Sequence, residues 1–291
     1  MDSEEQETTE TGTPVDETFQ AAAAQARQDP SDDAAWDALE DFAASSQRPD
    51  EVGALYREVL QGPLPDGVAS SLSERVVQFH EEWFREDSPQ LIEALRCVLR
   101  VDEGSADWAF QRLTVLFSVA ERWDELLSLY DDEIQGASDP ARKVALLEEA
   151  AQSAKDFASD PDRAIGYLKQ LLVLRPKDKQ LVSSLERLLD RQSRFDDLVE
   201  LWREQLTRRK GGPARTLKLQ IARTLASKLG RVGESIEVLE DLLDDPKADT
   251  APILEMLENF SSDESLDADP RRAALTILRA RYAEDGRPSQ V

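Results

Sequence analysis

The sequence predicts an all-α protein, built as a right-handed α-solenoid of about seven helix-turn-helix hairpins, from three observations. Leu, Ala, Glu, Arg and Gln dominate the composition and favour helices, whereas runs of the β-branched and aromatic residues typical of strands are nearly absent. A thirteen-residue pattern occurs three times, starting at Arg48, Arg122 and Arg194. A second pattern recurs in the stretches between and after these copies.

The first pattern describes one apolar face of a helix. Its aligned apolar positions are Val52, Leu126 and Leu198; Leu55, Leu129 and Leu201; Tyr56, Tyr130 and Trp202; and Leu60, Ile134 and Leu206. They follow the i, i+3, i+4 and i+8 spacing that places side chains on one side of a helix. Each copy begins with two acidic residues, where the positive end of the helix dipole favours negative charge. Trp202 and, outside the pattern, Trp36 are predicted to lie in the core.

The distances between equivalent leucines define the repeat. Those leucines are Leu55, Leu95, Leu129, Leu168, Leu201 and Leu239, at spacings of 40, 34, 39, 33 and 38 residues. Each interval has room for two helices and two turns, so the repeat is a helical hairpin. A single hairpin cannot bury its apolar face, and copies must therefore stack on one another.

The ends of the chain differ from the repeats. Residues 1–15 are acidic, rich in Thr and without apolar periodicity, and we expect them to form a disordered tail. The repeats are predicted to occupy residues 16–285, with a flexible C-terminal tail at 286–291.

One stretch carries a family resemblance. In "DRAIGYLKQLLVLRP", Ala164, Leu168, Leu171 and Pro176 fall at relative positions 0, 4, 7 and 12. This resembles the second helix of a tetratricopeptide repeat, whose 34-residue period matches the short intervals. The Trp, Leu-Gly and Tyr pattern of the family's first helix is missing and several units are longer, so half-TPR (HAT-type) and other α-solenoids stay open. The resemblance implies a protein-binding scaffold with ligands along the side formed by first helices.

The charge of the chain bears on its partners. The formal net charge is -25, which argues against nucleic acid and anionic membranes, because both are bound through Lys and Arg. No apolar run is long enough to span a bilayer, and the N-terminus lacks the basic and apolar parts of a secretory signal. A cytoplasmic location without membrane insertion is therefore expected.

Catalytic chemistry has few candidates in this sequence. His80 is the single histidine and Cys97 the single cysteine, too few to complete a zinc site. We expect a surface histidine and a buried cysteine rather than a catalytic pair. The acid clusters lack calcium-loop spacing, and no Gly-rich phosphate loop is present. The prediction is a protein without enzymatic activity, metal or cofactor.

A basic stretch stands out against the acidic background. Residues 203–231 contain nine basic residues and one acid, for a local charge of +8. The candidate partner-binding residues there are Arg208, Arg209, Lys210, Arg215, Lys218 and Arg223. The first three fall at the end of a predicted helix, where cations suit the dipole. The stretch could hold an acidic peptide, a terminal carboxylate or a phosphorylated tail, or it could pair with acids of neighbouring hairpins or of the N-terminus.

These observations favour a non-catalytic scaffold that binds a protein or peptide partner, with an acidic segment of that partner at the basic stretch. Two alternatives stay open. One is a regulatory or assembly subunit whose acidic exterior contacts a basic partner. The other is an RNA-associated helical-repeat protein that uses residues 203–231, although that stretch lacks interleaved aromatic residues. The sequence leaves the oligomeric state open.

Overall fold

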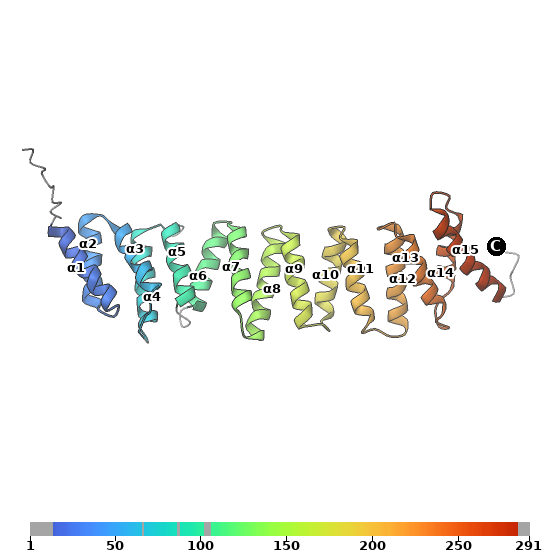
Figure 1. The fold of residues 1–291 in the computed structure, drawn as a ribbon, viewed down its shortest axis with the longest axis horizontal. Helices are drawn as coiled ribbons and strands as arrows, with labels where there is room; N and C mark the ends of the chain where they lie inside the picture. Colours follow the sequence, from blue (N-terminus) through green and yellow to red (C-terminus); the bar gives the residue numbers. More distant parts are fainter. Residues whose placement is uncertain (1–13, 66, 86–87, 102–105, 285–291) are drawn as a thin grey trace, which may run out of the picture. The chain divides into compact units, whose positions relative to one another are not determined.

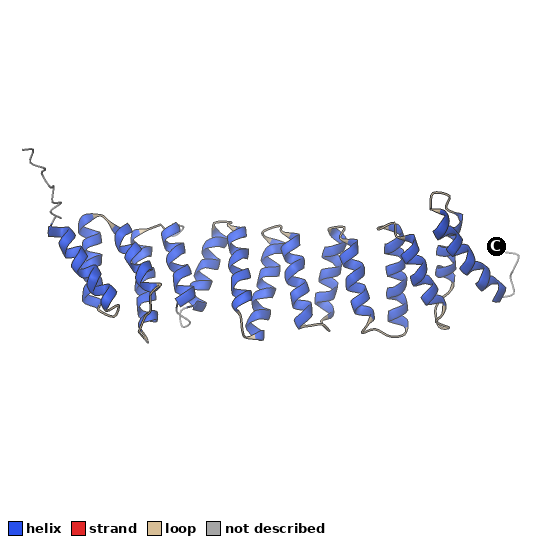
Figure 2. Ribbon diagram, viewed as in Figure 1, coloured by secondary structure: helices blue, strands red, loops and turns tan. Residues whose placement is uncertain are grey.

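The computed structural model describes residues 14–65, 67–85, 88–101 and 106–284, and these ranges contain fifteen α-helices and no strand (Figure 2). The helices are α1 (Pro14–Gln28), α2 (Asp33–Ser46), α3 (Pro49–Leu60), α4 (Val68–Trp83), α5 (Pro89–Val101), α6 (Ala106–Val119), α7 (Trp123–Gly136), α8 (Pro140–Asp156), α9 (Pro161–Leu174), α10 (Lys179–Arg191), α11 (Phe195–Leu206), α12 (Gly212–Ser227), α13 (Val232–Leu243), α14 (Ala251–Ser262) and α15 (Ala268–Glu284). The prediction of an all-α fold of repeated hairpins is confirmed.

The chain divides into two compact units. Unit 1 is Met1–Ala137 and holds α1 to α7, and unit 2 is Ser138–Val291 and holds α8 to α15. Within each unit, consecutive helices lie side by side as hairpins (Figure 1). Some odd-numbered helices also contact each other, α1 with α3, α3 with α5 and α13 with α15. Of the predicted tails, residues 1–13 and 286–291 lie outside the described residues, and Pro14 and Val15 belong to α1.

The repeated sequence patterns coincide with odd-numbered helices. The first pattern forms α3, α7 and α11, and the second forms α5, α9 and α13. The aligned apolar positions of the first pattern are buried in every copy, except that Leu206 is partly exposed. Stacking of hairpins therefore explains why the same residues recur, since each copy repeats the same contact.

Large aromatic side chains are buried in both units, and two of them make the same kind of hydrogen bond. Trp36 and Trp202 are 1% and 6% exposed, so the prediction that both lie in the core is confirmed. The Tyr56 hydroxyl donates to the Glu40 carboxylate at 2.5 Å, and the Trp202 indole Nε1–H donates to Glu186 at 2.8 Å. In both cases the acceptor lies sixteen residues earlier, on the preceding even-numbered helix. Burial and this hydrogen bond raise the pKa of Tyr56 far above its ordinary value, so its hydroxyl remains a donor.

An arginine at the N-cap position of α3, α11 and α13 joins two helices. Arg194 is the N-cap residue of α11; its Nε lies 2.6 Å from Asp197 in the first turn of α11, and its Nη1 lies 2.7 Å from Asp162 on α9. Arg48 binds Glu51 and Asp16 in the same manner, and Arg231 binds Glu234 and Asp196. Arg48, Arg194 and Arg231 thus each tie an odd-numbered helix to the preceding odd-numbered helix.

The residue before each of these arginines has a left-handed backbone. Its φ is 55° at Gln47, 53° at Glu121, 56° at Ser193 and 66° at Gly230. The following arginine N–H donates to a carbonyl in the last turn of the preceding helix, for example Arg194 to Leu189 at 2.9 Å. This is the turn that ends many helices, and it favours glycine because a Cβ is strained at positive φ.

Ser193 therefore offers a stabilising substitution. We expect Ser193→Gly to raise the free energy of unfolding of unit 2 by about 0.5–1 kcal/mol, because the strain of a side chain at positive φ is removed. Urea titration followed by circular dichroism measures the change. The matched control is Gly230→Ser, which should lose a similar amount, and equal midpoints for both variants would contradict the expectation.

Candidate functional site

Two of the six predicted basic residues are engaged within the fold. Arg215 Nη1 lies 3.0 Å from Asp245, just after α13, and Lys218 binds Asp241 on α13. The backbone N–H of Lys247 and the Arg215 guanidinium together lower the pKa of Asp245. Both ion pairs join α12 to α13 or to the residue just after it, so these two cations have partners within unit 2.

The other four predicted residues remain exposed. Arg208, Arg209, Lys210 and Arg223 form no ion pair with an acidic residue in the part of the chain that the structure describes. Arg208 Nη1 lies 3.5 Å from the Pro176 carbonyl oxygen, a long hydrogen bond between the turns that follow α9 and α11. Arg208 and Arg209 line pockets, and these pockets define the candidate site.

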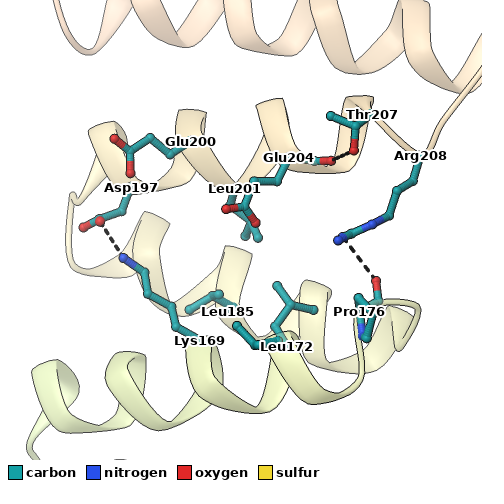
Figure 3. A pocket seen from close by; sticks show the side chains of 11 residues that line it. Lys169, Leu172, Pro176, Leu185, Asp197, Glu200, Leu201, Glu204, Thr207 and Arg208 are labelled. Atoms are coloured by element: carbon teal, nitrogen blue, oxygen red, sulfur yellow. Dashed lines mark hydrogen bonds and ion pairs between the residues drawn. The ribbon is translucent and has the colours of Figure 1, made fainter.

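A groove of about 540 Å³ runs between α9 and α11 (Figure 3). Leu172 of α9, Leu185 of α10 and Leu201 of α11 point toward one another in it. Lys169 Nζ binds Asp197 at 2.7 Å near one end, and Arg208 reaches the Pro176 carbonyl at the other. We call this the α9–α11 groove. One of its walls is α9, the helix that resembles the second helix of a tetratricopeptide repeat.

The walls of the α9–α11 groove differ in character. Val173 on α9 is 80% exposed and gives this wall its accessible apolar surface. On α11, the Glu200 and Glu204 carboxylates form no ion pair with a described cation, whereas Lys169 and Arg194 lower the pKa of Asp197. The groove therefore combines apolar surface with carboxylates that are free to accept hydrogen bonds.

A second pocket of about 580 Å³ shares Pro176 and Arg208 with the groove. Its lining includes four cations, Lys177, Lys179, Arg208 and Arg209, and we call it the cationic pocket. Lys177 and Lys179 lie at the start of α10 and outside the predicted basic stretch. In the sequence they belong to the run "RPKDKQ" from Arg175, about thirty residues before Arg208 and Arg209. The two pairs of cations come together only when the hairpins stack.

The sequence expectation for His80 is wrong. The side chain is fully buried in unit 1 and not at the surface. The Nδ1–H donates to the Val76 carbonyl at 2.7 Å, and Nε2 has no hydrogen-bond partner. Space for the ring exists because Gly53 of α3 has no side chain: a Cβ there would lie 3.1 Å from Nε2. Cys97 is buried, as predicted.

The buried His80 predicts a pH-dependent stability of unit 1. Burial lowers the pKa of His80, and the nearby Arg57 charge lowers it further. The unfolded chain therefore binds this proton at higher pH than the folded one, so stability is complete above about pH 6.5 and falls as the pH drops below that value. We expect His80→Gln to lose this component of the pH dependence in urea titrations between pH 7.5 and 5, and an unchanged dependence would contradict it.

The described ranges contain neither a candidate metal centre nor a candidate membrane span. No group of three or more His, Cys, Asp or Glu side chains there could hold a metal ion. None of the helices that the structure describes is both long and apolar enough to cross a membrane.

Comparisons with known proteins add little to this geometry. No family model matches the sequence, and no curated protein matches it. Among solved structures, the chain is similar to one in Naa15/Naa10 bound to HypK-THB, with 13% identity and a TM-score of 0.31. The match covers 94% of this chain and only 40% of the other. The likeness is too low to support an argument, so the class of protein, a helical-hairpin repeat protein, follows from the fold itself.

Proposed function

We propose that this chain is a non-catalytic scaffold or adaptor that binds a partner protein through unit 2, with a segment of the partner in the α9–α11 groove. The observation that supports the proposal best is the groove itself, where the exposed Val173 lies beside three buried leucines between α9 and α11. The array of stacked hairpins and its resemblance to diverged tetratricopeptide repeats agree with a binding role.

The physical basis is burial of the exposed apolar surface. A partner side chain packed on Val173, above the buried Leu172 and Leu201, would remove the exposed part of this surface from water, worth roughly 25 cal/mol for each Å² of apolar area buried. Glu200 and Glu204 could then accept hydrogen bonds from the backbone or from a basic residue of the partner. A partner segment with one apolar side chain and nearby donors fits this groove.

A comparison of two surface variants tests the proposal. Val173→Glu places a charge in the α9–α11 groove, whereas Phe157→Glu makes the same kind of change at a 58% exposed position at the end of α8. Both positions are exposed, so both variants should fold. In quantitative affinity capture with mass spectrometry, we expect Val173→Glu to lose a protein that the native chain and Phe157→Glu retain. An identical set from all three baits would contradict the proposal.

A further inference from the structure

We infer that the cationic pocket of unit 2 binds an acidic peptide segment, in which neighbouring Asp or Glu carboxylates contact Lys177, Lys179, Arg208 and Arg209. The inference rests on the proposed scaffold function for the source of that peptide. The site itself is argued from four observations about the pocket: free cations, a buried amide without a partner, two helix starts and a lining without aromatic rings.

The four cations of the pocket are available to a ligand. All four are exposed, and none forms an ion pair with an acidic residue among those that the structure describes. By contrast, Arg194, Arg203 and Arg231 of the same unit each bind at least one carboxylate. A chain with 60 acidic and 35 basic residues has ample acid to pair with its cations, so four unpaired cations on one pocket offer an external anion a site of concentrated positive charge.

Gln205 supplies a second, independent sign of a ligand. This α11 side chain is only 6% exposed, lines the cationic pocket, and its amide Nε2 has no hydrogen-bond partner. Buried polar groups are almost always satisfied, and an orphaned donor in a native protein calls for a specific explanation. A carboxylate oxygen that enters the pocket would give this donor an acceptor.

The helix ends strengthen the positive potential of the pocket. Lys179 is the first residue of α10, and Pro213 follows the first residue of α12, so both helices begin at the pocket. The N-terminal end of a helix carries a partial positive charge that favours anions. The net charge of -25 does not cancel this local field, because charges more than about 8–10 Å away are largely screened at physiological salt.

The character of the lining favours a peptide over other anions. Pro176, Val182 and Pro213 give apolar surface suited to the aliphatic stems of acidic side chains. No aromatic side chain lines the pocket, so nucleobases have nothing on which to stack. Glu186, the one acid in the lining, has its carboxylate engaged by the Trp202 indole. Because the pocket and the α9–α11 groove share Arg208 and Pro176, a single partner segment can fill both.

The test measures binding of a fluorescein-labelled decapeptide of glutamate to the full chain by fluorescence anisotropy at low salt. The pocket variant is Lys177→Glu with Arg209→Glu. The matched control is Arg191→Glu with Arg279→Glu, which makes the same charge change at two exposed cations elsewhere in unit 2, neither of them among the candidate binding residues. We expect the pocket variant to lose about tenfold or more in affinity and the control to lose less than about threefold. Circular dichroism confirms that both variants fold.

A third variant, Gln205→Met, removes the orphaned donor without changing the charge. We expect it to weaken peptide binding severalfold while its urea midpoint stays equal or rises, since no buried polar group is left unsatisfied. A merely structural glutamine would show the reverse, with unchanged affinity and a lower midpoint.

Several outcomes would overturn the inference. The first is that the glutamate peptide does not bind at low salt. The second is that the pocket and control variants lose affinity equally. The third is that inorganic phosphate or single-stranded RNA displaces the labelled peptide at a lower concentration than unlabelled peptide does. The glutamate peptide needs no native partner, and the Val173→Glu comparison needs no cationic pocket. Failure of this inference can therefore be told apart from failure of the proposed function.

Discussion

Replacing Trp36 with Ala is expected to lower the free energy of unfolding of unit 1 by about 3–5 kcal/mol. The indole is 1% exposed and stacks on the Tyr56 ring, with centroids 4.2 Å apart and planes within 8°. Its Nε1–H also donates to the Pro30 carbonyl at 3.0 Å, before α2 begins. The substitution therefore leaves a cavity, removes the ring contact with Tyr56 and leaves the Pro30 carbonyl without this hydrogen-bond donor.

Amide hydrogen exchange by mass spectrometry locates the loss, because stability in a repeat array is a sum of local terms. Peptides from α1 to α3 should exchange much faster in Trp36→Ala, while peptides from α9 to α13 in unit 2 should not change. Trp36→Phe, which keeps a ring in the stack, is the control and should lose clearly less. Unaltered protection of α1 to α3 in Trp36→Ala would show that this stack does not hold unit 1 together.

Arg75→Met should be the second most damaging of the predicted substitutions, with a loss of about 2 kcal/mol in unit 1. The Arg75 guanidinium contacts both Glu40 oxygens at 2.9 Å and the Tyr56 oxygen at 3.1 Å, and it also binds Asp37. Methionine keeps the packing of the stem but leaves the partly buried Glu40 carboxylate without its counter-charge. Three helices, α2, α3 and α4, lose their shared polar contact.

Asp37→Asn is the matched control, because Asp37 is 68% exposed and its pair with Arg75 is screened by water. We expect its urea midpoint to stay within about 0.5 kcal/mol of the native chain. Equal losses for Arg75→Met and Asp37→Asn would mean that the exposed pair, and not the Glu40 contact, carries the stabilisation.

Much of the fold follows from the sequence because its signals are local and repeated. The apolar positions of α3, α7 and α11 recur in register, and burial of Leu55, Leu129 and Leu201 confirms the face that the spacing predicts. The turns were harder to predict. Ser193 carries no sequence mark of its left-handed backbone, because glycine stands at the equivalent position only at Gly230. The prediction of a surface position for His80 was wrong because the space for its ring depends on Gly53, which lies on another helix.

The candidate site could be predicted only in part, because it depends on contacts between hairpins. The charge of the 203–231 stretch drew attention to Arg208 and Arg209, which do line the cationic pocket. Pairing of the stretch with acids of the fold was one of the alternatives, but the stretch could not indicate that Lys218 is one of the paired cations and Asp241 its partner. Nor could it indicate Lys177 or Lys179, whose place in the pocket results from stacking of α9 and α10 against α11.

Site-specific photo-crosslinking from position 173 tests the scaffold role most directly. A photoreactive amino acid at Val173, in the α9–α11 groove, is compared in cells with one at Asp190, an exposed position on α10. We expect a discrete cross-linked product that contains a second protein from position 173 and none from position 190. Absence of a product from 173, or the same products from both positions, would contradict the proposal that a partner protein occupies this groove.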